Sequence, residues 1–300
     1  MAKDGLTLIL MGGWNAEADV SRNSGAACLK AARDAGWNAE ALEVTKTIAE
    51  DLIRLKPERV FNALHGQMGE DGNIQGMLNL LDIPYTHSGL LASAIAMDKP
   101  ATKAALADTN IIFPETLPLT INDDALDLDH EGGVVIKPRN DGSSIGVHIS
   151  ADGTELPPYS FWPEGTALMA EPMIPGRELT VAVLDGEPLT VTEITQSNDF
   201  YDYQAKYADG GSQHHLPADV PDDVFDTVML WASLAHRHLG CRGVSRSDFR
   251  WNDATSEIFM LEINTQPGMT ATSLVPEQAG HMGIPMEELV NQLLEAAQCD

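Results

Sequence analysis

Two hydrophobic patterns follow one another along the chain, and the change comes near residue 95. In the first part, short apolar runs that end in glycine alternate with segments of helical periodicity. This alternation predicts a parallel sheet with helices on both faces, in which ligands bind beyond the carboxyl ends of the strands. The expected strands are 6–11, 59–66 and 84–89, and the expected helices are 24–36 and 72–83.

After residue 95, strand signals dominate the pattern. The segment 91–109 has helical periodicity but contains Pro100, which predicts a helix start or a break at that point. The apolar segments 133–138 and 147–150 flank a glycine-serine loop and predict an antiparallel pair. The proline-rich segment 151–165 is expected to be irregular. Further strands are expected at 166–174, 179–194, 244–251 and 257–265, and further helices at 222–240 and 285–297.

Length and composition indicate a globular protein of two or three domains. The chain has 300 residues, of which 43% are hydrophobic and 21% are charged. No apolar run approaches the roughly 20 residues that cross a bilayer, and the first one ends in Gly-Gly, like a strand rather than a signal peptide. Cys28, Cys241 and Cys299 are far apart and indicate neither a disulfide framework nor a zinc site, so a reducing cytoplasm is expected.

The formal net charge of −27 is the strongest compositional signal. It argues against nucleic acid and against anionic membrane surfaces as partners. We interpret the acidic run 122–131 as solvated surface without chemistry of its own. Positive charge is scarce, so its placement is informative. Each lysine beyond residue 60 is either an ordinary surface residue or a ligand for an anion, and these lysines are Lys99, Lys103, Lys137 and Lys206.

Two of the predicted strands carry polar side chains on one face. Alternate residues of a strand point the same way, so Arg246 and Asp248 share a face, as do Glu262 and Asn264. If the two strands are neighbours, their carboxylate and amide oxygens form a cluster of the kind that binds Mg²⁺ together with substrate phosphates. Alternation alone would also give solvent-facing polar positions on a half-exposed sheet, and the pattern leaves both interpretations open.

Three loops have compositions that are typical of ligand binding or of turns. Segment 137–146 (KPRNDGSSIG) offers backbone N–H groups to a phosphate, with Lys137 at its entrance. It has neither the P-loop spacing nor the G-x-G-x-x-G spacing, so an ordinary hairpin turn is the alternative. Segment 65–72 (HGQMGEDG) is likewise a glycine-rich turn or a substrate loop. Segment 198–216 is long, polar and aromatic, which slightly favours a lid over a flexible excursion.

Taken in order, these motifs resemble those of the D-alanine–D-alanine ligases of the ATP-grasp superfamily. The resemblance implies an α/β fold of the ATP-grasp type with three α/β domains, of which the first is Rossmann-like. The expected domain boundaries are 1–94, 95–171 and 172–300, with the metal site and the lid in the last. The resemblance runs nearly end to end and is carried by GGWNAEADVS (12–21), NALHGQMGEDG (62–72), YTHSGLLASAIAMDK (85–99), VVIKPRNDGSSIGV (134–147), PGRELTV (175–181), FYDYQAKY (200–207), GCRGVSRSDF (240–249) and LEINTQPGMTATSLVP (261–276).

The resemblance implies a cytoplasmic enzyme that joins two D-alanines through an acyl phosphate, for peptidoglycan synthesis, cell wall biogenesis and cell shape. Its expected ligands are D-alanine, ATP and two Mg²⁺ ions, with Mn²⁺ as a substitute. A homodimer is expected, and neither nucleic acid nor a membrane is an expected partner. The ATP-binding residues implied by the family pattern are Lys99, Lys137, Glu171, Met173, Ile174 and Glu178, and the implied metal ligands are Asp248, Glu262 and Asn264.

The family pattern also implies two amino-acid sites and an oxyanion site. The first D-alanine is held by its ammonium, the second by its carboxylate, and the oxyanion of the tetrahedral intermediate by a guanidinium and a backbone N–H. The implied residues are Glu17, Ser143, Tyr207 and His65 for the first D-alanine, Lys206, Ser273 and the backbone at Leu274 for the second, and Arg246 and Gly268 for the oxyanion.

The sequence departs from the family pattern at a few places. Residues 14–15 and 18–19 replace smaller or basic residues of many relatives but leave Glu17 in place. The segment 150–166 is short and contains prolines where many relatives have a helix, so a trimmed central domain is expected. The segment 245–249 (SRSDF) lacks the usual glycine beside its arginine but keeps the spacing from arginine to aspartate.

Three alternative functions agree less well with these motifs. A ligase that uses D-lactate or D-serine as its second substrate is the nearest one, but Tyr207 within YDYQAKY matches the dipeptide-forming members. A non-catalytic ATP-grasp module should have lost a metal ligand or a phosphate-binding cation, and the sequence retains them. A dinucleotide-binding protein with a Rossmann-like first domain should carry G-x-G-x-x-G after its first strand, and this motif is absent there.

Overall fold

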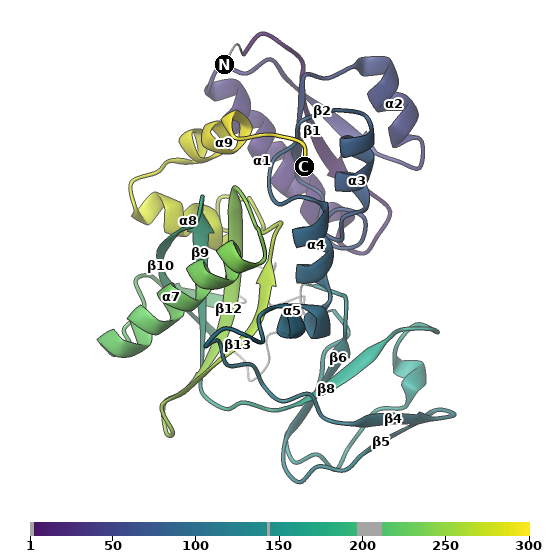
Figure 1. The fold of residues 1–300 in the computed structure, drawn as a ribbon, viewed down its shortest axis with the longest axis vertical. Coiled ribbons are helices and arrows are strands. Elements are labelled where there is room, and N and C mark those ends of the chain that lie inside the picture. The colour runs from purple at the N-terminus through teal and green to yellow at the C-terminus, as the bar shows by residue number, and fades with distance from the viewer. Residues whose placement is uncertain (1–2, 143–144, 197–211) are drawn as a thin grey trace.

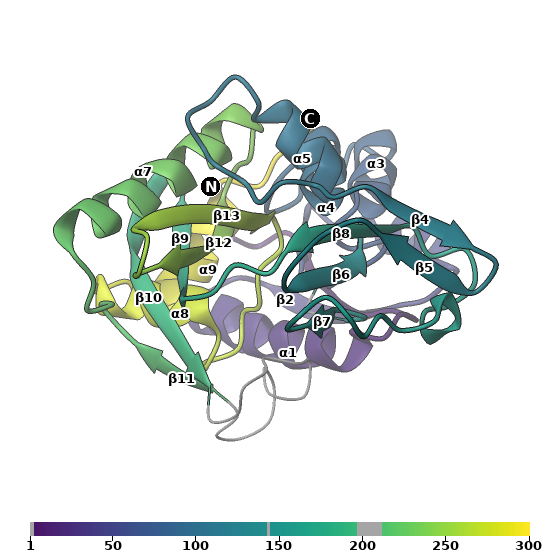
Figure 2. The same ribbon diagram turned by 90° about the horizontal axis from the view of Figure 1, so that it is seen from below.

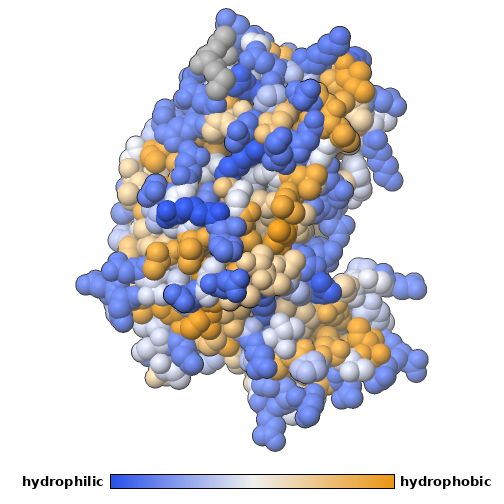
Figure 3. Space-filling view, viewed as in Figure 1, coloured by the Kyte–Doolittle hydropathy of each residue, from blue (hydrophilic) through white to orange (hydrophobic). Residues whose placement is uncertain are grey.

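The computed structural model describes residues 3–142, 145–196 and 212–300. Figure 1 shows an upper layer of strands and helices, a small group of strands that projects at lower right, and a larger sheet flanked by helices at left. Hydrophilic residues cover much of the outer rim of this face, in keeping with the net charge of −27 (Figure 3). Within the described segments, no helix is long and apolar enough to cross a membrane.

The N-terminal sheet is parallel, with the strand order β2-β1-β3. On β1, Ile9 and Met11 belong to one core cluster with residues of α1, while Leu8 and Leu10 belong to another with residues of α2 and α3. Successive side chains of β1 therefore pack on opposite faces, and the predicted parallel sheet between helices is confirmed. The elements are β1 (Thr7–Gly12), α1 (Ala18–Asp34), β2 (Ala39–Val44), α2 (Ile48–Leu55), β3 (Arg59–Asn62) and α3 (Asn73–Leu80).

This layer differs from the sequence prediction in several details. The strand β2 and the helix α2 were not predicted. The segment 84–89 is not a strand, because Tyr85 forms only isolated bridges, one to Val60 and one to Gln298. The preceding Pro84 has no N–H to donate to a longer ladder. Helix α1 begins at Ala18, and the prediction placed its start near residue 24 because the first residues of the helix include too few apolar side chains to show helical periodicity.

Two short helices replace the single helix predicted around Pro100. They are α4 (Leu90–Met97) and α5 (Lys99–Ala105). Between them, Asp98 has an extended backbone, and its side chain accepts the N–H of Ala101 at 2.9 Å. Pro100 lies in the first turn of α5, where a backbone N–H would have no partner inside the helix, so the predicted helix start is confirmed.

The projecting group of strands consists of a three-stranded antiparallel sheet, β7-β6-β8, and a hairpin. The predicted pairing of 133–138 with 147–150 is confirmed by β6 and β7. The acidic run around 122–131 forms part of the hairpin, which was not expected; its alternate residues Leu126 and Leu128 pack against the small core under the sheet. The elements are β4 (Leu119–Asn122), β5 (Ala125–Leu128), β6 (Val134–Pro138), β7 (His148–Ser150), the 3₁₀ turn η1 (Tyr159–Phe161) and β8 (Leu168–Pro172).

The C-terminal sheet is antiparallel, with the strand order β11-β10-β9-β12-β13. The predicted single strand 179–194 is wrong: the chain turns back at Asp185 and Gly186, which have positive φ angles of 49° and 87°. Positive φ at both central residues suits a two-residue hairpin turn. The elements are β9 (Arg177–Leu184), β10 (Glu187–Gln196), β11 (Ser212–His215), α7 (Asp222–His238), β12 (Val244–Asn252), β13 (Glu257–Asn264), α8 (Leu274–His281) and α9 (Met286–Glu295).

Helices cover both faces of this C-terminal sheet. Val181 and Val183 of β9 share a core cluster with residues of α7, whereas Ala182 shares a different cluster with residues of α8, α9 and α1. The second cluster continues into the N-terminal layer and so joins the two sheets. Figure 2 shows α7 on the outer side of the sheet and α1 and α8 on the other, with β6 and β8 lying beyond the inner end of β13.

Candidate functional site

A cavity of about 340 Å³ lies between the central strands and the C-terminal sheet. Apolar side chains of β6, β7 and β8 form one wall, and carboxylates of β12 and β13 lie at the other. Eight of the residues singled out in the sequence line it: Lys99, Lys137, Glu171, Met173, Ile174, Glu178, Asp248 and Glu262. A smaller adjoining cavity shares Lys99 and Glu262 and is lined by Asn264 as well.

The acidic wall is formed by two neighbouring antiparallel strands, which confirms the pairing that the sequence left open. Asp248 of β12 lies directly opposite Glu262 of β13, and Arg246 lies directly opposite Asn264. The register shifts between Asp248 and Phe249, which leaves one extra residue on β13. Side chains directly opposite one another point to the same face of a sheet, so both oxygen-bearing pairs converge on one surface.

Each oxygen-bearing side chain of this wall has donors from the protein. Arg246 binds Asp248 through two contacts, of 2.9 Å to Oδ1 and 2.7 Å to Oδ2, and Thr180 donates to Oδ1 at 2.6 Å. Glu262 Oε2 lies 3.1 Å from the ammonium of Lys99. The side-chain oxygen of Asn264 accepts the backbone N–H of Gln266 at 2.8 Å. The wall is therefore paired with cations and N–H groups of the same chain.

A buried carboxylate between two lysines occupies the other wall. Glu171 is 2% exposed; its Oε1 lies 2.6 Å from the ammonium of Lys103 and its Oε2 lies 2.5 Å from that of Lys137. Burial lowers the pKa of Lys137, and the charge of Glu171 opposes that effect. A carboxylate at this position presents acceptors only, next to an apolar wall that includes Met173 and Ile174.

The remaining predicted ATP ligand lies at the same cavity but is also engaged. Glu178 lies on β9 and forms an ion pair with Arg250 of β12, with 3.3 Å between Arg250 Nη2 and Glu178 Oε2. Both residues line the cavity. Glu178 therefore lies on the C-terminal sheet, across the cavity from the central strands.

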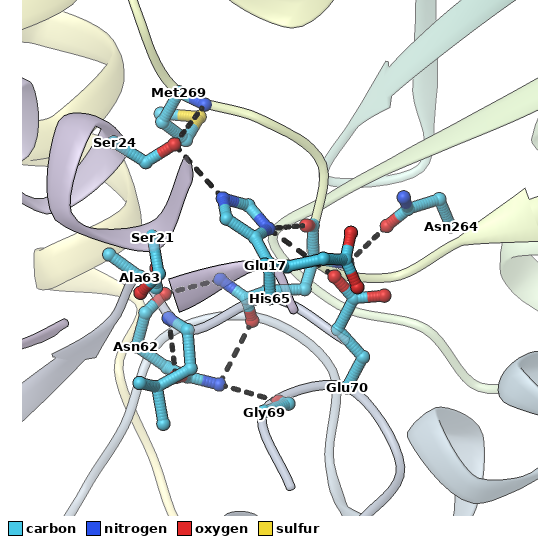
Figure 4. A network of polar contacts seen from close by, with 12 residues as sticks. Glu17, Ser21, Ser24, Asn62, Ala63, His65, Gly69, Glu70, Asn264 and Met269 are labelled. Atoms are coloured by element: carbon cyan, nitrogen blue, oxygen red, sulfur yellow. Dashed lines mark hydrogen bonds and ion pairs between the residues drawn. The ribbon is translucent and has the colours of Figure 1, made fainter. Parts of the chain in front are cut away.

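Glu17 lies away from the larger cavity, at the start of α1, and is buried (Figure 4). Its backbone N–H donates to Asn15 Oδ1, and the Asn15 amide donates to the carbonyls of His65 and Gln67 at 2.7 and 2.8 Å. Gly66 packs so closely that a Cβ atom there would lie 2.1 Å from Glu17 Oε2, and its φ is +67°. A larger residue would strain the backbone of this turn and displace the carboxylate.

Two buried hydroxyls of α1 hold the strand ends around Glu17. Ser21 accepts the N–H of Gly12 at 2.9 Å and donates to the carbonyl of Ala63 at 2.8 Å, so it links β1 to the turn after β3. Ser24 lies 2.9 Å from His65 Nε2 and accepts the N–H of Met269 at 3.3 Å. The contact between Ser24 and Met269 ties the loop after β13 to the N-terminal layer.

His65 joins three distant parts of the chain, as Figure 4 shows. Its Nε2 faces Ser24, while its Nδ1 lies 3.1 Å from the carbonyl of Gln266 and 3.3 Å from Glu70 Oε1. The Gln266 side chain in turn accepts a hydrogen bond from the side-chain amide of Asn62 and donates one to the backbone carbonyl of Asn62. Glu70, Gln266 and Asn62 were not singled out from the sequence; their burial in polar contacts depends on a fold that brings residues 62–70 and 264–269 together.

The loop after β13 leads to the start of α8, where three further predicted residues lie. Gly268 approaches Ser273 so closely that a Cβ atom would lie 2.9 Å from its hydroxyl oxygen. Ser273 precedes the first residue of α8, Leu274, and its hydroxyl lies 2.7 Å from that of Thr270. The backbone N–H groups at a helix start attract an anion such as a carboxylate. Three predicted site residues, Ser143, Lys206 and Tyr207, and most of the expected lid at 198–216, lie outside the described residues.

Within the described part of the chain, no three His, Cys, Asp or Glu side chains are grouped so that they could hold a metal ion by themselves. The set Asp248, Glu262 and Asn264 contains two carboxylates and one amide. Hard oxygen ligands of this kind fit Mg²⁺ when substrate phosphates and waters complete its coordination, so the residues present suit a metal that arrives with a nucleotide.

Comparison with known proteins shows similarity over nearly the whole chain. Residues 130–295 match the family model described as D-ala D-ala ligase C-terminus, and residues 37–88 match the one described as D-ala D-ala ligase N-terminus. The D-alanine–D-alanine ligase of Rhodospirillum rubrum is 50% identical over an alignment of length 300. The alignment covers 97% of this chain and 98% of that protein. That of Caulobacter vibrioides is 48% identical over 298 residues, covering 96% of this chain and 92% of that protein.

Solved structures give the same result. A crystal structure of D-alanine–D-alanine ligase from Bacillus anthracis superposes with a TM-score of 0.83 at 30% identity, covering 97% of this chain and 96% of the other. A structure of the enzyme from that organism complexed with ATP superposes with a TM-score of 0.81 at 27% identity, covering 98% and 97% of the two chains.

Proposed function

This chain belongs to the D-alanine–D-alanine ligase family, and we propose that the two cavities and the surrounding network carry out the ATP-dependent ligation of two D-alanines. The product, D-alanyl-D-alanine, serves peptidoglycan precursor synthesis. The observation that supports this most directly is the larger cavity itself. It combines an apolar wall, a buried acceptor, two lysines and an acidic strand pair, which is the set of groups that a nucleoside triphosphate requires.

In this proposal, ATP occupies the larger cavity. The adenine lies against Met173 and Ile174 with its amino group at Glu171, and the ribose lies at Glu178. Lys99 and Lys137 receive the phosphates. A volume of about 340 Å³ lies at the lower end of the range that is typical of small-molecule sites.

Asp248, Glu262 and Asn264 would hold two Mg²⁺ ions, or Mn²⁺ as a substitute. When bound, these ions would neutralise phosphate charge during phosphoryl transfer. Asp248 is paired with Arg246, and Glu262 with Lys99. The phosphates of a bound nucleotide would offer Lys99 a stronger anionic partner, which would free Glu262 for a metal.

The chain's residues act in two successive steps. Glu17 holds the ammonium of the first D-alanine, and His65 lies beside that substrate. The carboxylate of this D-alanine then attacks the γ-phosphorus of ATP, and ADP leaves. The amine of the second D-alanine then attacks the carbonyl carbon of the resulting acyl phosphate. Arg246 and the N–H of Gly268 stabilise the oxyanion, and phosphate leaves as the peptide bond forms.

The second D-alanine and the closing elements complete the proposal. Ser273, the N–H of Leu274 and Lys206 receive the carboxylate of the second D-alanine. Ser143 and Tyr207 share hydrogen bonds with Glu17, and the loop 198–216 closes over the acyl phosphate to exclude water. We also propose the domain boundaries 1–94, 95–171 and 172–300, a homodimer, and a cytoplasmic location.

The proposal is tested by phosphate release from MgATP with D-alanine, with L-alanine, or with D-alanine plus D-lactate, with products identified by mass. We expect D-alanyl-D-alanine in the two reactions that contain D-alanine and none in the reaction with L-alanine. A mixed ester in place of dipeptide would assign D-lactate as the second substrate and contradict the proposed specificity.

Two carboxylate variants test the metal ligands against a matched control. Asp248→Ala and Glu262→Ala should abolish turnover, whereas Asp253→Ala, an exposed carboxylate in the turn of the same β12–β13 hairpin, should leave it intact. Unchanged rates in the first two variants would contradict the role of Asp248 and Glu262 as metal ligands.

A further inference from the structure

Lys103 was the one lysine beyond residue 60 without a place in the family pattern, yet it contacts the candidate site. It lies four residues after Lys99 on α5, so the two ammonium groups project from one face of the helix. Lys99 lines the cavity, whereas Lys103 reaches Glu171 Oε1 from outside the described cavity lining, at 2.6 Å.

The ammonium of Lys103 is fixed by its other contacts. It donates to the carbonyl of Pro114 at 2.6 Å and to the hydroxyl of Thr116 at 3.1 Å. Its contact with Glu171 is an ion pair, so the ammonium has three oxygen partners within 3.1 Å. The helix that carries Lys103 is itself held by the cap at Asp98. Lys103 is therefore built into the wall behind Glu171.

Lys137 contacts the other oxygen of the same carboxylate but is placed differently. It lines the cavity on β6, directly before the loop that the sequence predicts to bind phosphate. Its ammonium lies 2.5 Å from Glu171 Oε2. If it turns towards the phosphates, Glu171 keeps one fixed ion pair, on Oε1, and exposes Oε2 to the ligand.

We infer that Lys103 is a positioning residue for recognition of the base: it holds Glu171 in place as an ionised acceptor once Lys137 has turned to the phosphates. This inference rests on the proposed function, because it requires the nucleotide in the larger cavity. An ionised carboxylate accepts hydrogen bonds and donates none. It therefore accepts from the 6-amino group of adenine and repels the 6-oxo group of hypoxanthine, so Lys103 contributes to the selection of ATP over ITP.

Replacing Lys103 by methionine removes the fixed partner and keeps a side chain of similar length. The carboxylate then either keeps Lys137 on Oε2, which occupies the acceptor for the 6-amino group and offers a donor to a 6-oxo group, or loses its fixed orientation, which weakens the same acceptor. In either case ATP loses more affinity than ITP. We expect the ratio of the ITP and ATP dissociation constants to fall at least tenfold, and Lys103→Arg to restore most of the ratio.

The experiment is a calorimetric titration of ATP and of ITP, with Mg²⁺ and without D-alanine, into the full-length wild type, Lys103→Met and Lys103→Arg. Lys30→Met is the matched control, because Lys30 is 78% exposed on α1 and pairs only weakly with Asp34 at the surface. A parallel loss of affinity for both nucleotides in Lys103→Met, with an unchanged ratio, would show that Lys103 only supports the fold and would overturn the inference.

The test stays decisive if Lys103→Met fails to fold. The double variant Lys103→Met/Glu171→Gln removes both charges and leaves an amide, which can donate to a 6-oxo group. Because Lys103 acts only through Glu171, we expect the double variant to have the same ratio of the ITP and ATP dissociation constants as Glu171→Gln alone, and a different ratio contradicts the inference. Because binding is measured without D-alanine, this result is independent of dipeptide formation by the wild type, which is assayed alongside and tests the proposed function.

Discussion

The turn at Gly66 gives the sharpest test of the site for the first D-alanine. Alanine at this position places a Cβ atom 2.1 Å from Glu17 Oε2 and 3.2 Å from the amide nitrogen of Asn15. Ordinary contact between a carbon and another heavy atom needs about 3.5 Å, so the carboxylate must withdraw by more than about 1 Å. A displacement of about 1 Å at a substrate-positioning group costs on the order of 100-fold in catalytic efficiency.

The same substitution also strains the backbone. At a φ of +67°, a Cβ atom costs about 1–2 kcal/mol, and the lower entropy of the unfolded alanine chain offsets about 0.4–1 kcal/mol of that. We therefore expect Gly66→Ala to lower the free energy of unfolding by about 1 kcal/mol. The folded fraction stays high, since a typical domain is stable by about 5–15 kcal/mol, and a large loss of activity then reflects the displaced carboxylate.

Gly36→Ala is the matched control for Gly66→Ala. Gly36 follows α1 with a φ of +87°, and a Cβ atom there meets no described atom within 4 Å. Gly36→Ala should show the backbone loss alone in urea unfolding and Gly66→Ala at least that loss, while only Gly66→Ala should lose about 100-fold in kcat/KM for D-alanine in an ADP-release assay. Equal losses of activity in the two variants, or none in Gly66→Ala, would refute the role given to Glu17.

Two further predictions follow from buried polar contacts. Thr180→Val removes the 2.6 Å hydrogen bond to Asp248 Oδ1, and it should raise the Mg²⁺ concentration for half-maximal activity by about tenfold; an unchanged magnesium titration would contradict the positioning of that carboxylate. Burial, followed by the nearby His65, lowers the pKa of His87 from 6.5 to about 3, so below pH 6.5 the unfolded chain takes up a proton that the folded chain does not. This protonation should lower the free energy of unfolding by about 2 kcal/mol between pH 7 and pH 5. In urea unfolding, His87→Gln should remove that part of the pH dependence. The same dependence of unfolding free energy on pH in the variant would exclude His87 as its source.

The acidic wall of the cavity could be predicted because it depends on local rules. The period of two in a strand places Arg246 and Asp248 on one face, and Glu262 and Asn264 on one face, before any partner is known. The structure adds the register, which pairs Asp248 with Glu262. The turn at residues 185–186 also had a local signal, Asp-Gly between two apolar segments, but the continuous apolar pattern around it was interpreted as one strand.

The network around His65 could not be predicted in the same way. Gln266 and Asn62 are 204 residues apart in the chain, and Ser24 and His65 are 41 apart. Nothing in the spacing of such residues specifies a contact, because it arises only when the core shared by α1, α8 and α9 joins the two sheets. The same holds for Lys103, whose helical position predicts a shared face with Lys99 but gives no indication of a carboxylate on β8.

The ion pairs of the site explain how so acidic a protein can receive a polyanion. With a net charge of −27, unpaired anions at the cavity would repel the phosphates, but Lys99 is paired with Glu262, Lys137 with Glu171, and Arg246 with Asp248. Under the proposed function, each of these cations can take a substrate oxygen as its new partner, and Glu262 passes to a metal that carries the opposite charge. Charges are thus exchanged between partners rather than newly buried, which avoids most of the desolvation cost of bringing isolated ions together in a cavity.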